Sequence, residues 1–234
     1  MGEPIRRPPA AVRGLVFDLD GTLVDSYGAI ALSVNAARKA FDLDPLHERD
    51  VRRRVGRGLE ALMADVLGTD RAAEGVRIFR QRYAEVYAEA TSALPDAVLT
   101  LRELRSRRYL LAVASNKPAR FGRQILEGLG MGGLLVTVEG PDTAGAAKPE
   151  PPMIERCLHA MRIGRGEAVY VGDMVLDVET AARAGVPVIL VPGGSSERED
   201  LLRTGAPVLG SLGELLELFP PLDERRDNEP AGAA

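Results

Sequence analysis

The chain has 234 residues, 45% of them hydrophobic and 27% charged, with a formal net charge of -4. This composition is ordinary for a globular protein of one large or two unequal domains, and it excludes general disorder. The acidic balance argues against a nucleic-acid or membrane surface as the main partner, because both usually require a basic excess.

Neither a membrane span nor a secretory leader is indicated. The apolar stretches are too short to cross a bilayer, and the Arg-bearing segment 2–9 lacks the apolar core of a signal peptide. We therefore expect a cytoplasmic protein. Its single cysteine, Cys157, cannot form an intramolecular disulfide, and the apolar spacing around it predicts the buried face of a helix rather than a catalytic thiol.

The most informative segment is GLVFDLDGTL at residues 14–23. A short apolar strand delivers two carboxylates, Asp18 and Asp20, one residue apart, and Gly21 lets the backbone turn behind them. Such an arrangement places a reactive carboxylate beside a metal ion. Taken alone, the segment also fits a turn with solvated acids or a fragment of a calcium-binding loop.

The next segment, residues 24–92, has helical periodicity throughout and predicts a small helical bundle inserted behind the acidic turn. Its apolar stripe of Phe79, Tyr83 and Tyr87 is expected to be core of this bundle. Arg57 lies between two glycines of the insert. The hypothesis that its guanidinium reaches a substrate carboxylate competes with a plain surface arginine.

From residue 94 onward, short apolar strands alternate with helices. The predicted strands are 109–114, 134–138, 168–171 and 187–191, and the predicted helices include 152–161 and 178–184. This alternation predicts an α/β fold, a Rossmann-like parallel sheet with helices on both faces. The domains we expect are a core of residues 1–23 and 93–222, a helical cap of residues 24–92, and a disordered tail at 223–234.

Polar side chains follow four of the predicted strands. In chain order they are Asp18 and Asp20, Ser115 and Asn116, Lys148, and Asp173 with Asp177. Because ligands of open parallel sheets bind beyond the carboxyl ends of the strands, we expect these groups to meet at one edge. Together they offer a nucleophile, an acid/base, a hydroxyl and an amide for phosphate oxygens, a cation, and acids for a metal.

Each position also has a simpler interpretation. Lys148 alone fits a solvated surface charge beside two loop prolines. Ser115 and Asn116 fit the N-cap of the helix that follows, and Asp177 fits a capping acid. The functional interpretation rests on all four positions occurring in one order.

The four segments resemble the motifs of the haloacid dehalogenase-like phosphohydrolase superfamily. The matching stretches are FDLDGTL at 17–23, SNKP at 115–118, KPEP at 148–151 and GDMVLD at 172–177. Within the superfamily, the chain is most similar to phosphoglycolate phosphatase-like enzymes. Two positions depart from the pattern: Met174 stands where a small polar residue is common, and residues 95–97 lack the glycine often found at this hinge.

The resemblance implies a role for each motif residue. Asp18 attacks phosphorus and forms an aspartyl-phosphate, and Asp20 protonates the departing alkoxide and then deprotonates the hydrolytic water. Magnesium is held by Asp18, the backbone carbonyl of Asp20 and Asp173, with Thr22 and Asp177 in support. The groups that bind the phosphoryl oxygens are Ser115, Asn116, Lys148 and the backbone amide at Leu19.

The function that the resemblance implies is magnesium-dependent hydrolysis of a small phosphorylated metabolite, with phosphoglycolate as the named candidate. The helical insert acts as a lid that excludes water and reads the leaving group. One alternative is a phosphomutase similar to β-phosphoglucomutase, and another is a phosphate- or metal-binding regulatory module without turnover. We expect neither nucleic acid nor membrane as a partner, and a monomer or homodimer.

Overall fold

The computed structural model of the protein describes residues 12–222, so the tail predicted at residues 223–234 lies outside the described part. Its centre is a five-stranded sheet in the order β5-β4-β1-β6-β7, in which every neighbouring pair is parallel. The strands are β1 (Gly14–Phe17), β4 (Leu110–Ala114), β5 (Thr137–Glu139), β6 (Ala168–Gly172) and β7 (Val188–Leu190). The predicted α/β fold with a parallel sheet is confirmed.

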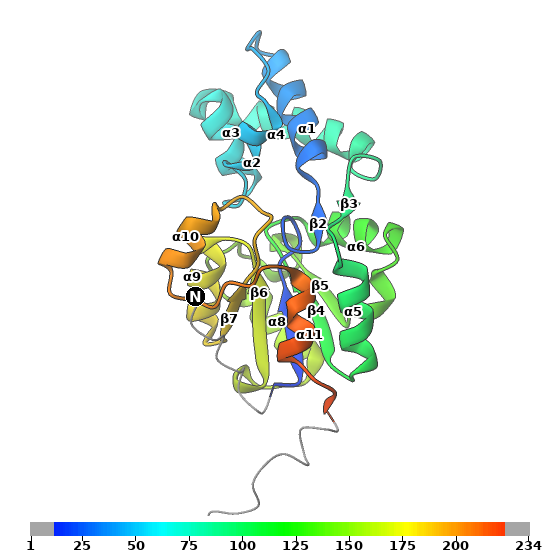
Figure 1. The fold of residues 1–234 in the computed structure, drawn as a ribbon. Coiled ribbons are helices and arrows are strands. Elements are labelled where there is room, and N and C mark those ends of the chain that lie inside the picture. The colour runs from blue at the N-terminus through cyan, green and yellow to red at the C-terminus, as the bar shows by residue number, and fades with distance from the viewer. Residues whose placement is uncertain (1–11, 223–234) are drawn as a thin grey trace, which may run out of the picture.

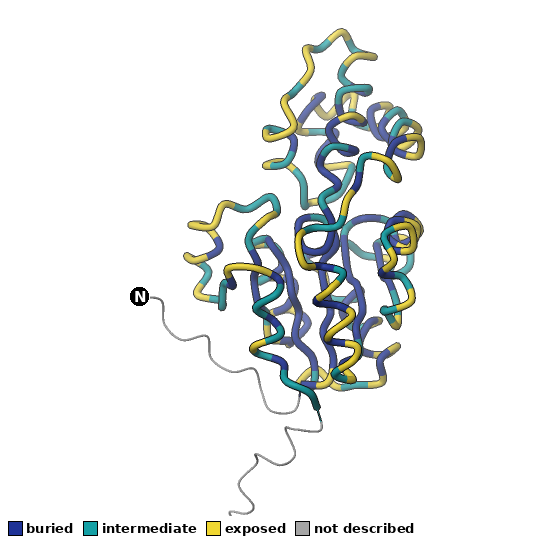
Figure 2. Tube along the Cα trace, turned by 45° about the vertical axis from the view of Figure 1, so that its right-hand side comes forward, coloured by how far each residue is buried: buried dark blue, intermediate teal, exposed yellow. Residues whose placement is uncertain are grey.

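Helices cover both faces of the sheet, which explains why its strands are apolar throughout. Successive residues of β1 point to opposite faces: Leu15 and Phe17 join one apolar core, and Val16 joins another. The first core is covered by α5 (Ala97–Ser106), α6 (Ala119–Gly128) and α11 (Leu215–Leu218), and the second by α8 (Pro152–Met161) and α9 (Val175–Ala184). Figure 2 shows the buried strands between helices whose outer faces are exposed.

A separate group of helices lies above the sheet, on the side where β1 ends (Figure 1). It contains α1 (Tyr27–Lys39), α2 (Glu48–Arg52), α3 (Leu59–Leu67) and α4 (Thr69–Val86). These helices share an apolar core of their own, in which α4 packs on α1 and α3. We call the segment from α1 to α4 the cap, and the rest of the described chain the core domain.

Two short strands flank the cap, β2 (Val24–Asp25) and β3 (Ser92–Ala93), and they pair antiparallel. The prediction that residues 24–92 are helical throughout is therefore wrong at the ends, because a two-residue strand is too short to show a period. The pair holds the two connections to the cap side by side. Just beyond it, Asp96 has φ 62°, the left-handed conformation that glycine adopts most easily, so this segment makes a glycine-like turn without a glycine.

Other differences from the prediction lie in the core domain. The strand predicted at 134–138 is Thr137–Glu139, because the preceding apolar residues Leu134 and Leu135 pack against the core from a 3-10 turn and its exit. Helix α9 begins at Val175 rather than 178, since Asp177 accepts a hydrogen bond from the Met174 backbone and caps the first turn.

The remaining elements are short. They are α7 (Pro141–Ala144), which the sequence did not predict, α10 (Arg198–Arg203), and the 3-10 turns Gly132–Leu134, Arg165–Glu167 and Leu212–Glu214. Within residues 12–222, every helix is too short or too polar to cross a membrane.

Candidate active site

The carboxyl ends of the central strands bring the predicted site residues together. The backbone N–H of Asp18 donates to the Val171 carbonyl at 2.8 Å, so the ladder between β1 and β6 extends as far as this carboxylate. Ser115 follows β4 and Asp173 follows β6 in the same way. Three of the predicted groups are thus fixed by strand ends rather than by flexible loops.

The loop after Asp18 turns tightly. The carbonyl of Leu19 accepts hydrogen bonds from the backbone of Leu23 at 2.9 Å, and the Leu19 side chain is buried, so only its backbone is available to a ligand. Gly21 has φ 88°, and a Cβ at this position would lie 2.7 Å from Asp173 Oδ2. No larger residue fits between the two acidic segments.

Lys148 lies between two of the acids. Its Nζ is 2.9 Å from Asp18 Oδ1 and 2.8 Å from Asp177 Oδ1, and the residue is only 6% exposed. Burial alone would lower the pKa of Lys148, but the two carboxylates outweigh this effect and raise the pKa above its ordinary value. The side chain is therefore a fixed cation in contact with the predicted nucleophile.

Asp173 and Asp177 form the other wall of the site, and both are fully buried. Asp173 accepts hydrogen bonds from the Thr22 hydroxyl at 2.8 Å and the Ser195 backbone at 3.2 Å. Asp177 accepts from the backbone of Asp173 and of Met174, each at 3.0 Å. Burial raises the pKa of both carboxyl groups, and other carboxylates nearby raise it further.

The donor set fits a divalent cation. Asp18, Asp173 and Asp177 each offer a buried carboxylate oxygen, and the three oxygens lie within 4.8 Å of one another. The three carboxylates carry more negative charge than the single ammonium of Lys148 can balance. Hard oxygen ligands of this kind suit magnesium, which binds a few carboxylates together with substrate oxygens and water. Lys148 pairs with one oxygen of Asp18 and one of Asp177, but the second oxygen of Asp177 also accepts two backbone hydrogen bonds. The hydrogen-bond donors to Asp173 are neutral, so Asp18 and Asp173 are the better direct ligands.

Asp20 lies on the side of the site that faces the cap. Its Oδ2 is 3.0 Å from Lys117 Nζ, and its Oδ1 accepts a short hydrogen bond from the Ser26 hydroxyl. Lys117 also donates to the Tyr83 hydroxyl at 2.7 Å. Burial would lower the pKa of Lys117, but Asp20 and Tyr83 outweigh it, so the pKa is raised and the side chain stays charged.

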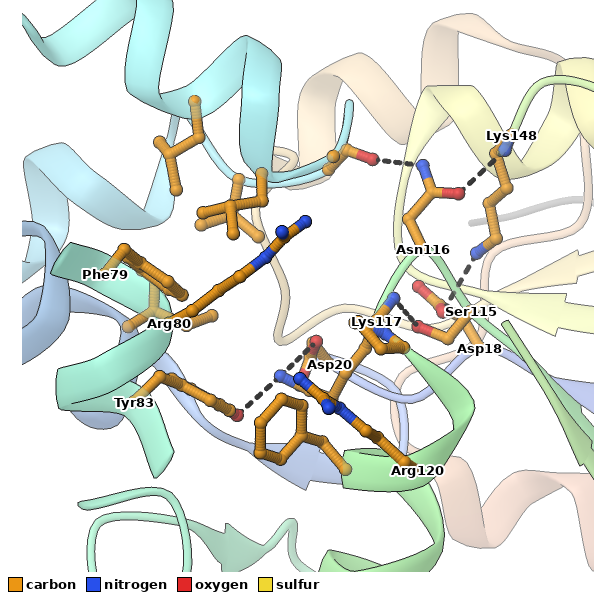
Figure 3. Close-up of a pocket in the computed structure, with 18 of the residues that line it drawn as sticks. Asp18, Asp20, Phe79, Arg80, Tyr83, Ser115, Asn116, Lys117, Arg120 and Lys148 are labelled. Carbon is orange, nitrogen blue, oxygen red and sulfur yellow. Dashed lines mark hydrogen bonds and ion pairs between the residues drawn. The ribbon is translucent and has the colours of Figure 1, made fainter. Parts of the chain in front are cut away.

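The predicted phosphate-binding groups differ in their surroundings. Ser115 is buried and lines the same pocket as Asp18. Asn116 is engaged at both ends of its amide, since Nδ2 donates to the Gly56 carbonyl and Oδ1 accepts from the Lys148 backbone, each at 2.7 Å (Figure 3). It therefore joins the cap to the Lys148 loop, a contact that the sequence did not predict.

A pocket of about 110 Å³ lies between the cap and the core domain. Its core-domain side includes Asp18, Asp20 and Lys148, and its cap side includes Phe79 and Tyr83 (Figure 3). Pockets for larger ligands usually measure about 300–1,000 Å³, so this one suits a substrate of few heavy atoms.

Two arginines that the sequence did not single out also line the pocket. Arg80 reaches in from α4 and Arg120 from the start of α6 (Figure 3). Arg80 also pairs with the exposed Glu60 at 3.0 Å. Arg57 is exposed and is not among the lining residues, although both of its neighbouring glycines are.

The aromatic stripe of the cap has a second role besides the predicted one. Phe79 and Tyr83 belong to the apolar core of the cap, as expected. Tyr83 and Tyr87 also contact the ring of Phe121 in the core domain edge-on, with centroids 5.2 and 5.3 Å apart. The stripe is therefore part of the boundary between cap and core domain, which helical periodicity alone does not reveal.

Lys117, the cation at this boundary, carried one signal in the sequence, because it is one of only three lysines among 30 basic residues.

Comparison with known proteins agrees with this geometry. A family model described as haloacid dehalogenase-like hydrolase matches residues 15–191, most of the chain. The chain belongs to this family. The phosphoglycolate phosphatase of Rhodospirillum rubrum is 34% identical over 234 residues, which cover 94% of this chain and 97% of that protein. The phosphoglycolate phosphatase of Aquifex aeolicus is 34% identical over 183 residues, 78% of this chain and 86% of that protein.

Solved structures of the haloacid dehalogenase-like family share the fold. A predicted phosphoglycolate phosphatase from Haemophilus somnus has a TM-score of 0.83 at 25% identity, covering 89% of this chain and 98% of that chain. CbbY from Rhodobacter sphaeroides, in complex with xylulose-1,5-bisphosphate, has a TM-score of 0.75 at 20% identity, covering 89% and 99%. The expected family and the hydrolase class are confirmed, and the curated relatives named above are phosphoric monoester hydrolases.

Proposed function

We propose that this hydrolase is a magnesium-dependent phosphatase that cleaves a small phosphorylated metabolite through an aspartyl-phosphate on Asp18, with phosphoglycolate as the first candidate substrate. The observation that carries the proposal is the position of Asp18. It lies at the pocket, 2.9 Å from the Lys148 ammonium and beside two further buried carboxylates. A carboxylate held against a cation and a metal site is suited to attack phosphorus.

The first step transfers the phosphoryl group to the enzyme. A carboxylate oxygen of Asp18 forms a bond to phosphorus while the ester P–O bond breaks, and the electron pair of that bond stays on the leaving oxygen. Asp20, which lines the same pocket, donates a proton to this oxygen, so the leaving group departs as an alcohol. Ser115 and Lys148, which line this pocket, bind the phosphoryl oxygens in this scheme.

The second step releases phosphate. Asp20, now a carboxylate, accepts a proton from a water molecule as its oxygen attacks phosphorus, and the bond between phosphorus and Asp18 breaks. Lys148 remains charged and balances the negative charge of Asp18 before the first step and again as Asp18 leaves phosphorus in the second. Magnesium, held by Asp18, Asp173 and the backbone carbonyl of Asp20, would supply positive charge that offsets the repulsion between the anionic nucleophile and an anionic substrate.

The candidate substrate is chosen on the charges and size of the pocket. Phosphoglycolate carries a carboxylate besides its phosphate, and the pocket offers two guanidinium groups, Arg80 and Arg120, in addition to the two buried lysines. The curated relatives described above are phosphoglycolate phosphatases. These observations favour a small substrate with two anionic ends.

The decisive experiment replaces Asp18 by the nearly isosteric asparagine. Asp18→Asn should reduce magnesium-dependent release of inorganic phosphate by at least about 10³-fold, because an amide does not act as the nucleophile. Phosphate release from a panel of phosphorylated metabolites, with and without magnesium, measures this loss. Detection of an isomerised sugar phosphate instead of free phosphate would show a mutase.

A matched control is Asp70→Asn, which changes the same group on the exposed surface of the cap. It should keep wild-type activity. Both variants should retain the circular dichroism spectrum of the native protein, and full activity of Asp18→Asn would contradict the mechanism.

A further inference from the structure

Lys117 is the least expected charged group at the pocket. Its ammonium lies within 3.0 Å of Asp20 Oδ2 and donates to the Tyr83 hydroxyl at 2.7 Å. It also lies 4.7 Å from the centre of the Tyr83 ring. One buried cation from the core domain thus contacts both the proposed proton donor and a helix of the cap.

Asp20 is held at both of its oxygens. Oδ2 is paired with Lys117, and Oδ1 accepts the hydrogen bond of Ser26, the residue directly before α1. The Asp20 side chain is only 12% exposed and that of Lys117 only 6%, so water competes little for either contact. The direction in which the Asp20 carboxyl points is therefore set by Lys117 and by the entrance to the cap.

Tyr83 fixes Lys117 from the other side. It is buried on α4, stacked on Phe79 at 5.5 Å and edge-on to Phe121 at 5.2 Å. A phenol held by rings on both domains gives the flexible lysine side chain a fixed partner. Without that hydroxyl, the ammonium keeps Asp20 as a partner but loses the contact that orients it.

We propose that Lys117 is a positioning residue, which aims the Asp20 carboxyl at the leaving oxygen and is itself held in place by the Tyr83 hydroxyl of the cap. The inference rests on the proposed function, because it assigns Asp20 to proton transfer. On this proposal, the orientation of the Asp20 carboxyl depends on helix α4 of the cap. Tyr83 on α4 holds Lys117, and Lys117 holds Asp20. Neither Lys117 nor Tyr83 exchanges a proton with the substrate in this scheme.

The test uses the dependence of the rate on the leaving group. An alkyl phosphate needs its leaving oxygen protonated, whereas p-nitrophenyl phosphate leaves readily as the phenolate. The value of kcat/KM covers the steps up to release of the alcohol, so it isolates this protonation from hydrolysis of the aspartyl-phosphate. Lys117→Met should lower kcat/KM about 10²-fold for an alkyl phosphate and less than about 10-fold for p-nitrophenyl phosphate, the same pattern as Asp20→Asn.

Tyr83→Phe removes only the hydroxyl and keeps the ring packing. The loss of kcat/KM should show the same selectivity for the alkyl phosphate but be smaller, about 10-fold. Combining Tyr83→Phe with Lys117→Met should lower kcat/KM little further, because both changes act on the Asp20 carboxyl. The matched controls are Tyr87→Phe, one turn further along the same stripe, and Lys39→Met, an exposed lysine of the cap. Both controls should match the wild type.

Other results would overturn the inference. An equal loss on both esters in Lys117→Met would mean that the lysine binds the phosphoryl group or supports the fold. Unchanged kinetics in Tyr83→Phe would remove the link to the cap. If the wild type released no phosphate from any ester, the proposed function would fail and this inference with it, whereas an active wild type with unselective variants would reject the inference alone.

Discussion

Among single residues, Cys157 is a reactive group that the fold hides completely. It is fully buried, its thiol lies 3.4 Å from the Val113 carbonyl, and burial raises its pKa well above the ordinary value. Only the thiolate reacts with alkylating reagents. We therefore expect iodoacetamide at about pH 8 to leave Cys157 unmodified in the native protein and to modify it fully in urea, as measured by mass spectrometry. Rapid labelling of the native protein would show that α8 opens locally.

Sequence reasoning at this scale succeeded where a residue follows a strand directly. Asp18, Ser115 and Asp173 come together because parallel strands end at one edge, a rule that needs no knowledge of side-chain packing. It did not find Lys117, whose partner Tyr83 lies 34 positions away in another domain. For Arg57, the sequence suggested a site residue that does not line the pocket. Its flanking glycines indicate a flexible loop but do not tell where its side chain lies.

At the scale of elements, helix termini offer a direct test of backbone conformation. Directly after α8 comes Arg162, an exposed residue with φ 57°, a conformation that costs most residues energy but suits glycine. Arg162→Gly should raise the free energy of unfolding by about 0.5 kcal/mol or more, measured by urea titration. The reverse change at the end of α9, Gly185→Ala with φ 69°, should lower it by about 1 kcal/mol. Destabilisation by Arg162→Gly would mean that this arginine makes a stabilising contact.

We expect the two elements that carry the pocket arginines to contribute separately to the binding of the proposed substrate. Arg80→Gln on α4 and Arg120→Gln on α6 should each raise KM for phosphoglycolate about 10-fold, because each removes a charged hydrogen bond to the carboxylate. The KM for a phosphate ester with a neutral leaving group should stay within about twofold. Arg82→Gln is the control, since Arg82 is on the same helix as Arg80 but pairs with Glu85 outside the pocket. An equal rise in KM for both esters would assign these arginines to the phosphate instead.

Element prediction was most accurate where a clear apolar period occurs. Helix α8 spans the predicted Pro152–Met161 because its apolar stripe repeats regularly and a proline marks its start. The strand β5 is shifted because apolar residues in a 3-10 turn look the same as a strand in sequence. The pair β2–β3 was not predicted because its register joins positions 67 and 69 residues apart that carry no local pattern.

For the whole molecule, the site lies where the cap and the core domain, each with apolar packing of its own, meet around charged groups. Besides the aromatic and lysine contacts, the cap meets the core domain through the Asn116–Gly56 hydrogen bond and the ion pair of Arg53 with Glu197. The two parts also approach closely at Gly56, where a Cβ would lie 2.2 Å from Met174 Cε. Met174 therefore packs on the cap loop at the position where the family often has a small polar residue. No sequence rule pairs a glycine of one domain with a methionine of the other. The family motifs therefore led to a hypothesis about the chemistry but not to this contact between the cap and the core domain.

On the proposed function, we expect the stability of the protein to depend jointly on magnesium and pH. Asp173 has a pKa raised well above its ordinary value by burial and by the charges of Asp177 and Asp18. A carboxyl group with a raised folded-state pKa favours folding below its unfolded pKa, and this contribution is lost as the pH rises through the folded pKa. Magnesium bound by the deprotonated carboxylates would offset their mutual repulsion, so we expect its affinity to rise over the same pH range.

We therefore expect saturating magnesium to raise the Tm more at about pH 8 than at about pH 5, by about 5 °C or more at the higher pH, in differential scanning calorimetry. Asp173→Asn separates this coupling from non-specific salt effects. Because it removes a buried charge while keeping the shape of the side chain, its metal-free form should melt above the metal-free wild type at neutral pH, and magnesium should shift its Tm little. An equal magnesium shift at both pH values, or in both proteins, would show that the ion binds elsewhere than at this buried cluster.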